Sequence, residues 1–165
     1  MMNELSWKND EGLTLYGVDW PVKKPCAVIA LVHGQGEHIG RYAHVAKWFN
    51  DHDIALMGFD MQGYGKSEGK RGHAASMEVL QNDIGIFVEK TRQRYPDTPL
   101  FLYGHSFGGA LALAMVLLFG AALLIAADTF SRLVVSPAEL PIGIIMALIG
   151  APVFLWILLA RRATM

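Results

Sequence analysis

Apolar residues in the first 106 positions follow two patterns, continuous runs and stripes at helical spacing. Continuous aliphatic runs are typical of strands that are buried on both faces, whereas apolar residues three or four positions apart indicate helices. We therefore expect strands at 13–20, 27–32, 54–59 and 100–103 and helices at 41–50 and 76–95. Because strands alternate with helices, the pattern predicts an α/β fold with a parallel sheet.

Each of the two predicted helices has one apolar face. Ser76 is a suitable N-cap for the second helix, and Pro96 ends that helix. The inner faces are expected to consist of Tyr42, Val45, Ala46 and Phe49 in the first helix and of Met77, Leu80, Ile84, Phe87 and Val88 in the second.

The pattern changes after residue 106. Two uncharged stretches of 21 residues, 107–127 and 140–160, would as helices be long enough to cross a bilayer core. Arg161 and Arg162 follow the second stretch, and paired arginines favour the cytoplasmic side. We therefore expect a C-terminal apolar, transmembrane helical hairpin in the cell inner membrane, with the N-terminal domain and the C-terminus in the cytoplasm.

The first uncharged stretch has an alternative interpretation. Residues 108–118 can form a buried helix of the α/β fold, followed by a strand at 121–127. In that case the membrane prediction rests on 140–160 alone. For this second stretch a place in a soluble core is a poor fit, because a core element rarely stays apolar on all sides for 21 residues. Without either span, the chain would be cytoplasmic.

Composition and charge exclude several classes. The 14 basic and 15 acidic residues give a net charge of −1, which does not indicate a nucleic-acid partner. Apolar residues make up 53% of the chain and charged residues 18%, but only five charged residues and no histidine follow Ser106. The histidines lack the spacing of metal ligands and no phosphate-binding loop is found, so no metal or cofactor is predicted.

The pentapeptide Gly-His-Ser-Phe-Gly at 104–108 fits the nucleophile-elbow pattern G-x-S-x-G. A predicted strand precedes it and a run of small residues follows it, which is the context that an elbow requires. Ser106 is therefore the candidate nucleophile, at the start of a helix whose dipole favours a developing negative charge. The alternative at this point is a glycine-rich turn without chemistry.

A second glycine-containing turn, His-Gly-Gln-Gly-Glu-His at 33–38, follows the first buried run. In this position it supplies one main-chain amide of an oxyanion hole, from Gln35, and the residue after the nucleophile, Phe107, supplies the other. Two donors aimed at a tetrahedral intermediate accelerate its formation by orders of magnitude. For His33 itself we expect a structural role.

Four blocks carry a family resemblance and lie at 33–42, 60–67, 69–73 and 104–109; the second reads Asp60-Met-Gln-Gly-Tyr-Gly-Lys-Ser67. In order and spacing they resemble the monoacylglycerol lipase and lysophospholipase group of α/β-hydrolases. The resemblance covers about residues 1–114 and implies a truncated α/β-hydrolase sheet. It also implies a lipid ester as substrate, with Ser106 as nucleophile and the amides of Gln35 and Phe107 as the oxyanion hole.

The catalytic acid and histidine of such a hydrolase are not found. α/β-Hydrolases place both after the nucleophile, but no histidine follows Ser106, and the later acids are Asp128 and Glu139. Because a serine needs an adjacent base to react rapidly, we expect impaired activity, with little or none from the isolated chain.

Three further blocks lie at 120–132, 136–143 and 147–156, and the second reads Ser-Pro-Ala-Glu-Leu-Pro-Ile-Gly. Together they resemble the C-terminal end of the permease subunits of iron-siderophore and cobalamin ABC importers. We therefore divide the chain into an α/β-hydrolase part at 1–114 and a permease-like membrane helical segment at 115–165. The resemblance implies permease or ATPase subunits as partners. A membrane-spanning fragment of such a permease, or a fused reading frame without evolved function, is thus an alternative to an ester hydrolase.

Overall fold

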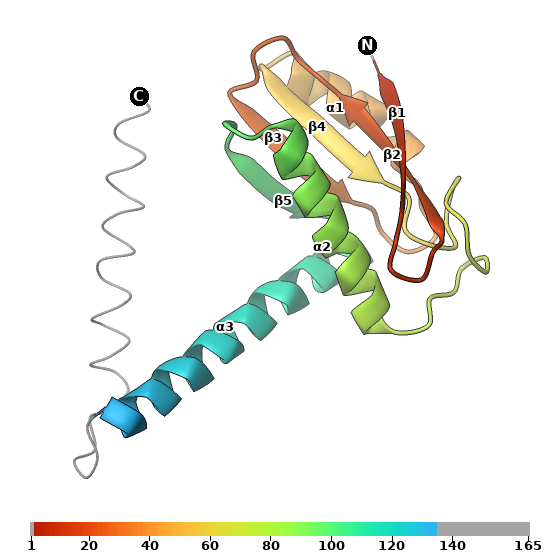
Figure 1. Ribbon diagram of the computed structural model, residues 1–165. Helices are drawn as coiled ribbons and strands as arrows, with labels where there is room; N and C mark the ends of the chain where they lie inside the picture. The colour runs from red at the N-terminus through yellow and green to blue at the C-terminus, as the bar shows by residue number, and fades with distance from the viewer. Residues whose placement is uncertain (1, 135–165) are drawn as a thin grey trace. The chain divides into compact units, whose positions relative to one another are not determined.

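The computed structural model describes residues 2–134 (Figure 1). The chain divides into two units, Met1–Met115 and Val116–Met165, and the fold described below is that of the first unit. A five-stranded sheet forms its centre. The strands are β1 (Asn3–Lys8), β2 (Thr14–Trp20), β3 (Ala27–Val32), β4 (Ile54–Phe59) and β5 (Leu100–Gly104).

The sheet is mixed, with the strand order β1-β2-β4-β3-β5. β3 pairs in parallel with both β4 and β5, as predicted. The prediction of an entirely parallel sheet is wrong at the other edge, where β1 pairs antiparallel with β2 and β2 antiparallel with β4. The physical reason is that both connections, 9–13 between β1 and β2 and 21–26 between β2 and β3, are too short for the crossover of a dozen or more residues that parallel strands need.

β1 was not expected from the sequence. Its side chains alternate between exposed and partly buried, and Trp7 is its only buried residue. Edge strands of this kind bury only part of one face, so they lack the continuous aliphatic run that identified β3 and β4. The ranges predicted for β3 and β4, 27–32 and 54–59, are confirmed to the residue.

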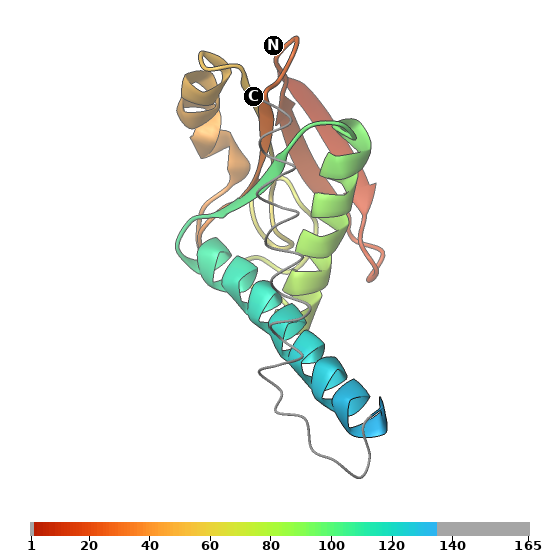
Figure 2. The same cartoon turned by 90° about the vertical axis from the view of Figure 1, so that its left-hand side faces the viewer.

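Helices cover both faces of the sheet. A 3-10 turn, η1 (Ile39–Tyr42), leads into α1 (Ala43–Asn50) on one face, and α2 (Met77–Arg94) lies on the other. Figure 2 shows α1 and α2 on opposite sides of the strands. The unit is therefore a three-layer α/β/α arrangement, which is the layering expected when crossover helices connect parallel strands.

Two apolar clusters fill the space between the layers. Ala30 and Val32 of β3 belong to the cluster beneath α2. Ile29 and Leu31, the alternate residues of the same strand, belong to the cluster beneath α1. Because successive side chains of a strand point to opposite faces, one continuous aliphatic run serves both clusters.

The predicted face of α2 is mostly confirmed. Ser76 caps the helix, because its hydroxyl oxygen accepts a hydrogen bond of 3.2 Å from the amide of Val79. Leu80, Ile84 and Phe87 are buried in the core, and Val88 packs against it. Met77 was wrongly assigned to this face: its side chain is 50% exposed, because it lies in the first turn, at the rim of a cavity.

The first turns of α3 (Phe107–Val134) belong to the α/β core. Leu111 is completely buried, and Phe107 and Met115 pack against the same cluster as α2. The interpretation of 108–118 as a buried core helix is confirmed only as far as Met115, because Val116 and Leu117 are exposed. A strand at 121–127 is wrong, because the helix continues through these residues to Val134.

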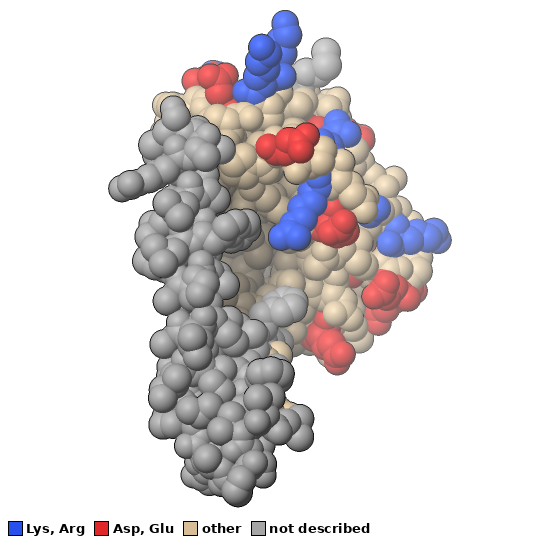
Figure 3. Space-filling view, turned by 60° about the vertical axis from the view of Figure 1, so that its left-hand side comes forward, with Lys and Arg blue, Asp and Glu red and all other residues tan. Residues whose placement is uncertain are grey.

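The transmembrane prediction finds no support in the part of the chain that the structure describes. Within residues 2–134, no helix is both long and apolar enough to cross a membrane. The second predicted span, 140–160, lies outside the described residues. On the face drawn in Figure 3, acidic and basic side chains are interspersed over the described surface.

Candidate active site

Ser106 lies in a sharp turn between β5 and α3 and adopts a φ of 52°. Positive φ is rare for a residue with a side chain and costs about 1–3 kcal/mol, so it persists only where the surrounding chain enforces it. Two hydrogen bonds do this: the amide of His105 donates to the carbonyl of Val32 (3.0 Å), and the amide of Gly108 donates to the carbonyl of His105 (3.0 Å). The backbone of Ser106 is therefore that of a nucleophile elbow.

The glycines of the elbow are required by close approach. A Cβ atom at Gly104 would lie 2.5 Å from the carbonyl carbon of Gly108. A Cβ atom at Gly108 would collide with the main-chain oxygen atoms of Val32 and His33. The first turn of α3 can thus approach the end of β3 only because these positions carry no side chain.

The turn that carries Gln35 follows β3, the strand adjacent to β5. Val32 and Gly104, the last residues of these strands, are direct partners in the parallel register. The turns that follow therefore begin side by side. The amide of Glu37 donates to the carbonyl of Gly34 (3.3 Å), which closes a tight turn around Gln35.

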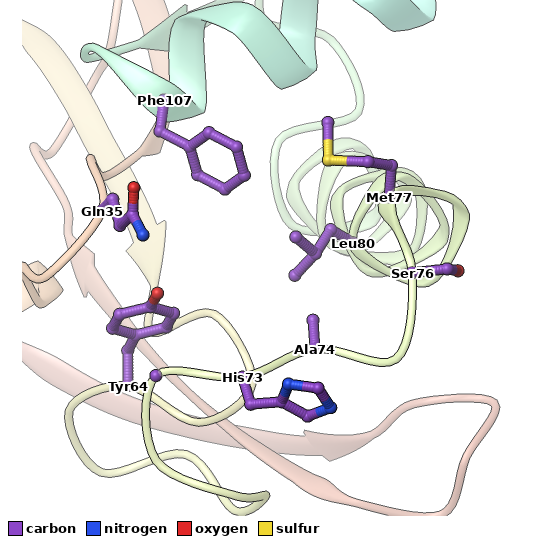
Figure 4. Close-up of a pocket in the computed structure, with 9 residues that line it drawn as sticks. Gln35, Tyr64, His73, Ala74, Ser76, Met77, Leu80 and Phe107 are labelled. Carbon is purple, nitrogen blue, oxygen red and sulfur yellow. The ribbon is translucent and has the colours of Figure 1, made fainter.

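Gln35 and Phe107 line one open cavity of about 290 Å³. In Figure 4 the ring of Phe107 faces the space in front of Leu80 and Met77, and Gln35 and Tyr64 lie across from them. Its remaining lining residues are Gly72, His73, Ala74 and Ser76, from the loop before α2 and the start of that helix. The structure thus brings the carriers of both predicted oxyanion amides together, while their catalytic roles remain predictions.

His33 is fully buried, and both of its ring nitrogens are engaged. Nε2 accepts a hydrogen bond of 3.0 Å from the amide of Met61, so Nδ1 carries the proton and donates to the carbonyl of Gly34 (2.7 Å). Burial lowers the pKa of His33, which favours this neutral form. His33 therefore fastens the loop after β4 to the turn after β3, which is the structural role expected from the sequence.

Asp60, at the end of β4, holds the loop that forms one wall of the cavity. The buried carboxylate accepts hydrogen bonds from the amides of Ile39 (2.6 Å) and Lys66 (2.8 Å). The hydroxyl of Ser67 donates to the carbonyl of Asp60 and accepts from the amide of Tyr16 (2.9 Å). The first and last residues of the block at 60–67, Asp60 and Ser67, thus have structural roles.

Glu37 is a site residue that the sequence did not single out. Its Oε2 atom accepts hydrogen bonds from the hydroxyl of Tyr42 (2.6 Å) and the amide of Gly34 (3.1 Å), and it lies 3.0 Å from Nδ1 of His105. These contacts, that with Tyr42 above all, lower the pKa of Glu37 to about 2. Burial and the adjacent carboxylate raise the pKa of Tyr42, which keeps its hydroxyl protonated as a donor.

A comparison of the sequence with protein families identifies the family of this chain. The family described as "Serine aminopeptidase, S33" matches residues 23–150. The chain belongs to this family. The match continues past the boundary expected at residue 114, and the expected permease resemblance of residues 116–165 finds no support in the comparisons.

Curated members of the group include lipases. The chain is 38% identical over 106 residues to the monoglyceride lipase of Mus musculus, covering 64% of this chain and 35% of that protein. It is 32% identical over 97 residues to a phospholipase of Bacillus subtilis, covering 59% of this chain and 37% of the relative. The chain thus spans little more than a third of the length of these relatives.

Solved structures agree with the fold. A soluble variant of monoglyceride lipase from Saccharomyces cerevisiae is similar with a TM-score of 0.62 at 25% identity, over 69% of this chain and 38% of that one. A thermostable carboxyl esterase from Bacillus coagulans has a TM-score of 0.61 at 28% identity, over 67% of this chain and 38% of that one. The described unit is therefore the N-terminal part of an α/β-hydrolase fold.

Proposed function

We propose that this chain carries the nucleophile and the oxyanion-stabilising part of a serine ester hydrolase that acts on lipid esters. The observation that carries the proposal is the elbow at Ser106, with its φ of 52°, beside the turn that holds Gln35. The names of the relatives, a monoglyceride lipase and a phospholipase, favour an acyl ester of a lipid as the substrate class.

In the proposed reaction, the hydroxyl oxygen of Ser106 attacks the carbonyl carbon of the ester. The carbonyl oxygen becomes negatively charged, and the main-chain amides of Gln35 and Phe107 donate hydrogen bonds to it. The positive end of the α3 dipole adds to this stabilisation. Collapse of the intermediate breaks the bond to the alkoxy oxygen, which takes up the Ser106 proton through solvent water and leaves as the alcohol, and the acyl group stays on Ser106.

The cavity beside these amides is suited to an acyl chain. The side chains of Phe107, Leu80 and Met77 present apolar surface to it. Burial of methylene groups against such surface contributes about 0.8 kcal/mol for each group. We propose that the acyl part of the ester occupies this space.

The rate of acylation depends on how readily the hydroxyl of Ser106 loses its proton. No histidine follows Ser106 in the sequence, and the ring of His33 is held in structural hydrogen bonds. We therefore propose that the chain by itself acylates slowly, with the stabilisation of the oxyanion as its main contribution.

Labelling with a fluorophosphonate probe tests the proposal, because such a probe reacts with a serine hydroxyl and places its P=O oxygen in the oxyanion hole, which accelerates the reaction even without an adjacent base. Peptide mapping should find the label on Ser106, at a rate that exceeds the background of a folded Ser106→Ala variant. Equal rates for the two chains would contradict the proposal.

A further inference from the structure

Glu37 bonds to both of the loops that form the candidate site. Its carboxylate accepts from the amide of Gly34, the residue before Gln35, and it contacts Nδ1 of His105, the residue before Ser106. Glu37 and His105 are 68 positions apart in the sequence. The carboxylate is therefore a direct link between the turn after β3 and the elbow after β5.

All three contacts converge on one atom, Oε2. The approach is close: a Cβ atom added at Gly34 would lie 3.0 Å from Oε2 and 3.2 Å from Nδ1 of His105. Hydrogen bonds to an ionised acceptor are about twice as strong as those between neutral groups. The position of Oε2 therefore fixes the distance between Gly34 and His105.

Tyr42 connects this atom to the core. Its ring is buried in the cluster beneath α1, and its hydroxyl makes the shortest of the three contacts, 2.6 Å. The side chain of Arg41 approaches the second oxygen of Glu37 at 3.8 Å. Because a packed aromatic ring has few accessible rotamers, Tyr42 gives the carboxylate a rigid support.

We propose that Glu37 is a positioning residue, which sets the separation of the two oxyanion-hole amides by clamping Gly34 and His105. This proposal rests on the proposed function, since it concerns the same pair of amides. Gln35 directly follows one clamped residue, and Phe107 is two positions beyond the other. An error of about 1 Å in such a geometry lowers reaction rates by about 100-fold.

The charge of Glu37 is part of the clamp. With three donors around Oε2, the carboxylate form is strongly favoured, and the pKa of about 2 keeps it ionised throughout the range in which an ester hydrolase is assayed. Glu37→Gln retains the size of the side chain and one acceptor oxygen but removes the charge. Glu37→Ala removes every contact.

The first measurement is the rate at which Ser106 reacts with the fluorophosphonate probe. We expect Glu37→Ala to reduce it about 10- to 100-fold, with Glu37→Gln and Tyr42→Phe between Glu37→Ala and the parent chain. Glu89→Gln, an exposed acid of α2, serves as the matched control and should leave the rate unchanged. Urea unfolding of each variant gives the folded fraction by which the rates are normalised.

The second measurement is independent of reactivity. In ¹⁵N-labelled protein, Glu37→Gln should shift the amide signals of Gly34, His105 and Phe107, whereas Glu89→Gln should not. Normal labelling in folded Glu37→Ala would overturn the positioning role while leaving the hydrolase proposal intact. If the parent chain were not labelled but Glu37→Gln shifted these amide signals, the hydrolase proposal alone would be overturned. If Glu37→Gln left the signals of His105 and Phe107 unchanged, the positioning role of Glu37 would be overturned.

Discussion

The side-chain amide of Asn9 donates a hydrogen bond of 3.0 Å to Oδ1 of Asp83, and both side chains are buried. The same amide also donates to Oε1 of Gln62 (3.2 Å), so the network joins the end of β1, α2 and the loop after β4. Among the described residues, Oδ2 of Asp83 has no hydrogen-bond partner. Burial raises the pKa of Asp83 to about 6, and the nearby acids Glu11 and Asp10 add to the increase, which the Asn9 hydrogen bond partly opposes.

The raised pKa of Asp83 predicts that stability falls between about pH 4 and pH 7. The folded chain binds the carboxyl proton of Asp83 more tightly than the unfolded chain, in which the pKa is near 3.8. The stability gained from this tighter binding is therefore fully present below about pH 3.8 and is lost as the pH rises through about 6. The difference of about two pKa units corresponds to roughly 3 kcal/mol. Urea unfolding at pH 4.5 and pH 7.5 should show about 2 kcal/mol of this difference, because part of the contribution is already lost at pH 4.5.

Asp83→Asn should remove most of this pH dependence. The amide retains an acceptor for Asn9 and has no charge to bury, so the free energy of unfolding at pH 7.5 should rise by about 1–3 kcal/mol. Asp97→Asn, at an exposed position, is the control. If the two variants had the same pH dependence as the parent chain, Asp83 would not be the titrating group.

Asp60→Asn should destabilise the chain by about 2–4 kcal/mol. Both carboxylate oxygens accept from main-chain amides, those of Ile39 and Lys66, and the NH2 group of asparagine would place a donor against one of these donors. Chemical denaturation at pH 7.5 gives the change, with exposed Asp51→Asn as the reference. A loss below about 0.5 kcal/mol would be that of an ordinary surface substitution and would contradict this account of Asp60.

Two glycine-to-alanine substitutions should have opposite effects. At Gly108 the added methyl group would collide with the main chain of Val32 and His33, so we expect a loss of several kcal/mol in stability. At Gly85, within α2, nothing lies within 4 Å of the added atom, and alanine should stabilise the helix by about 0.5–1 kcal/mol. Thermal unfolding measures both changes against the parent chain. If both variants raised, or both lowered, the unfolding temperature, this account of the two glycines would be wrong.

The uncharged stretch at 140–160 still predicts membrane association. We propose that alkaline carbonate extraction leaves the chain in the membrane pellet, and that Leu148→Lys, which puts a charge in the middle of the stretch, moves it toward the supernatant. Release of the unmodified chain would contradict the prediction.

The sequence predicted the elements whose burial is continuous. β3 and β4 were located to the residue because both of their faces are covered, and Ser106 was identified because the elbow has strict local requirements. β1, with one buried side chain, has no comparable pattern. Its antiparallel pairing was missed for the same reason.

Roles that depend on distant contacts could not be found in this way. Asn9 and Asp83 are 74 positions apart, and Glu37 and His105 are 68 apart. No local pattern distinguishes Glu37 from an exposed acid. Although helical spacing places Asp83 on the face of Leu80 and Phe87, it does not show the distant partner Asn9. Met77 was misplaced because helical spacing does not show that a cavity opens beside the first turn of the helix.

The pairing of Val32 with Gly104 has a consequence for how this site can change during evolution. Both proposed donors are main-chain N–H groups, in the turns that follow these two partners. Their placement depends on strand pairing and on the glycines that permit close approach, and much less on which side chains occupy positions 35 and 107. Relatives can therefore diverge at both positions and retain the same anion-binding geometry, so side-chain differences there are a poor guide to whether the oxyanion hole has been lost.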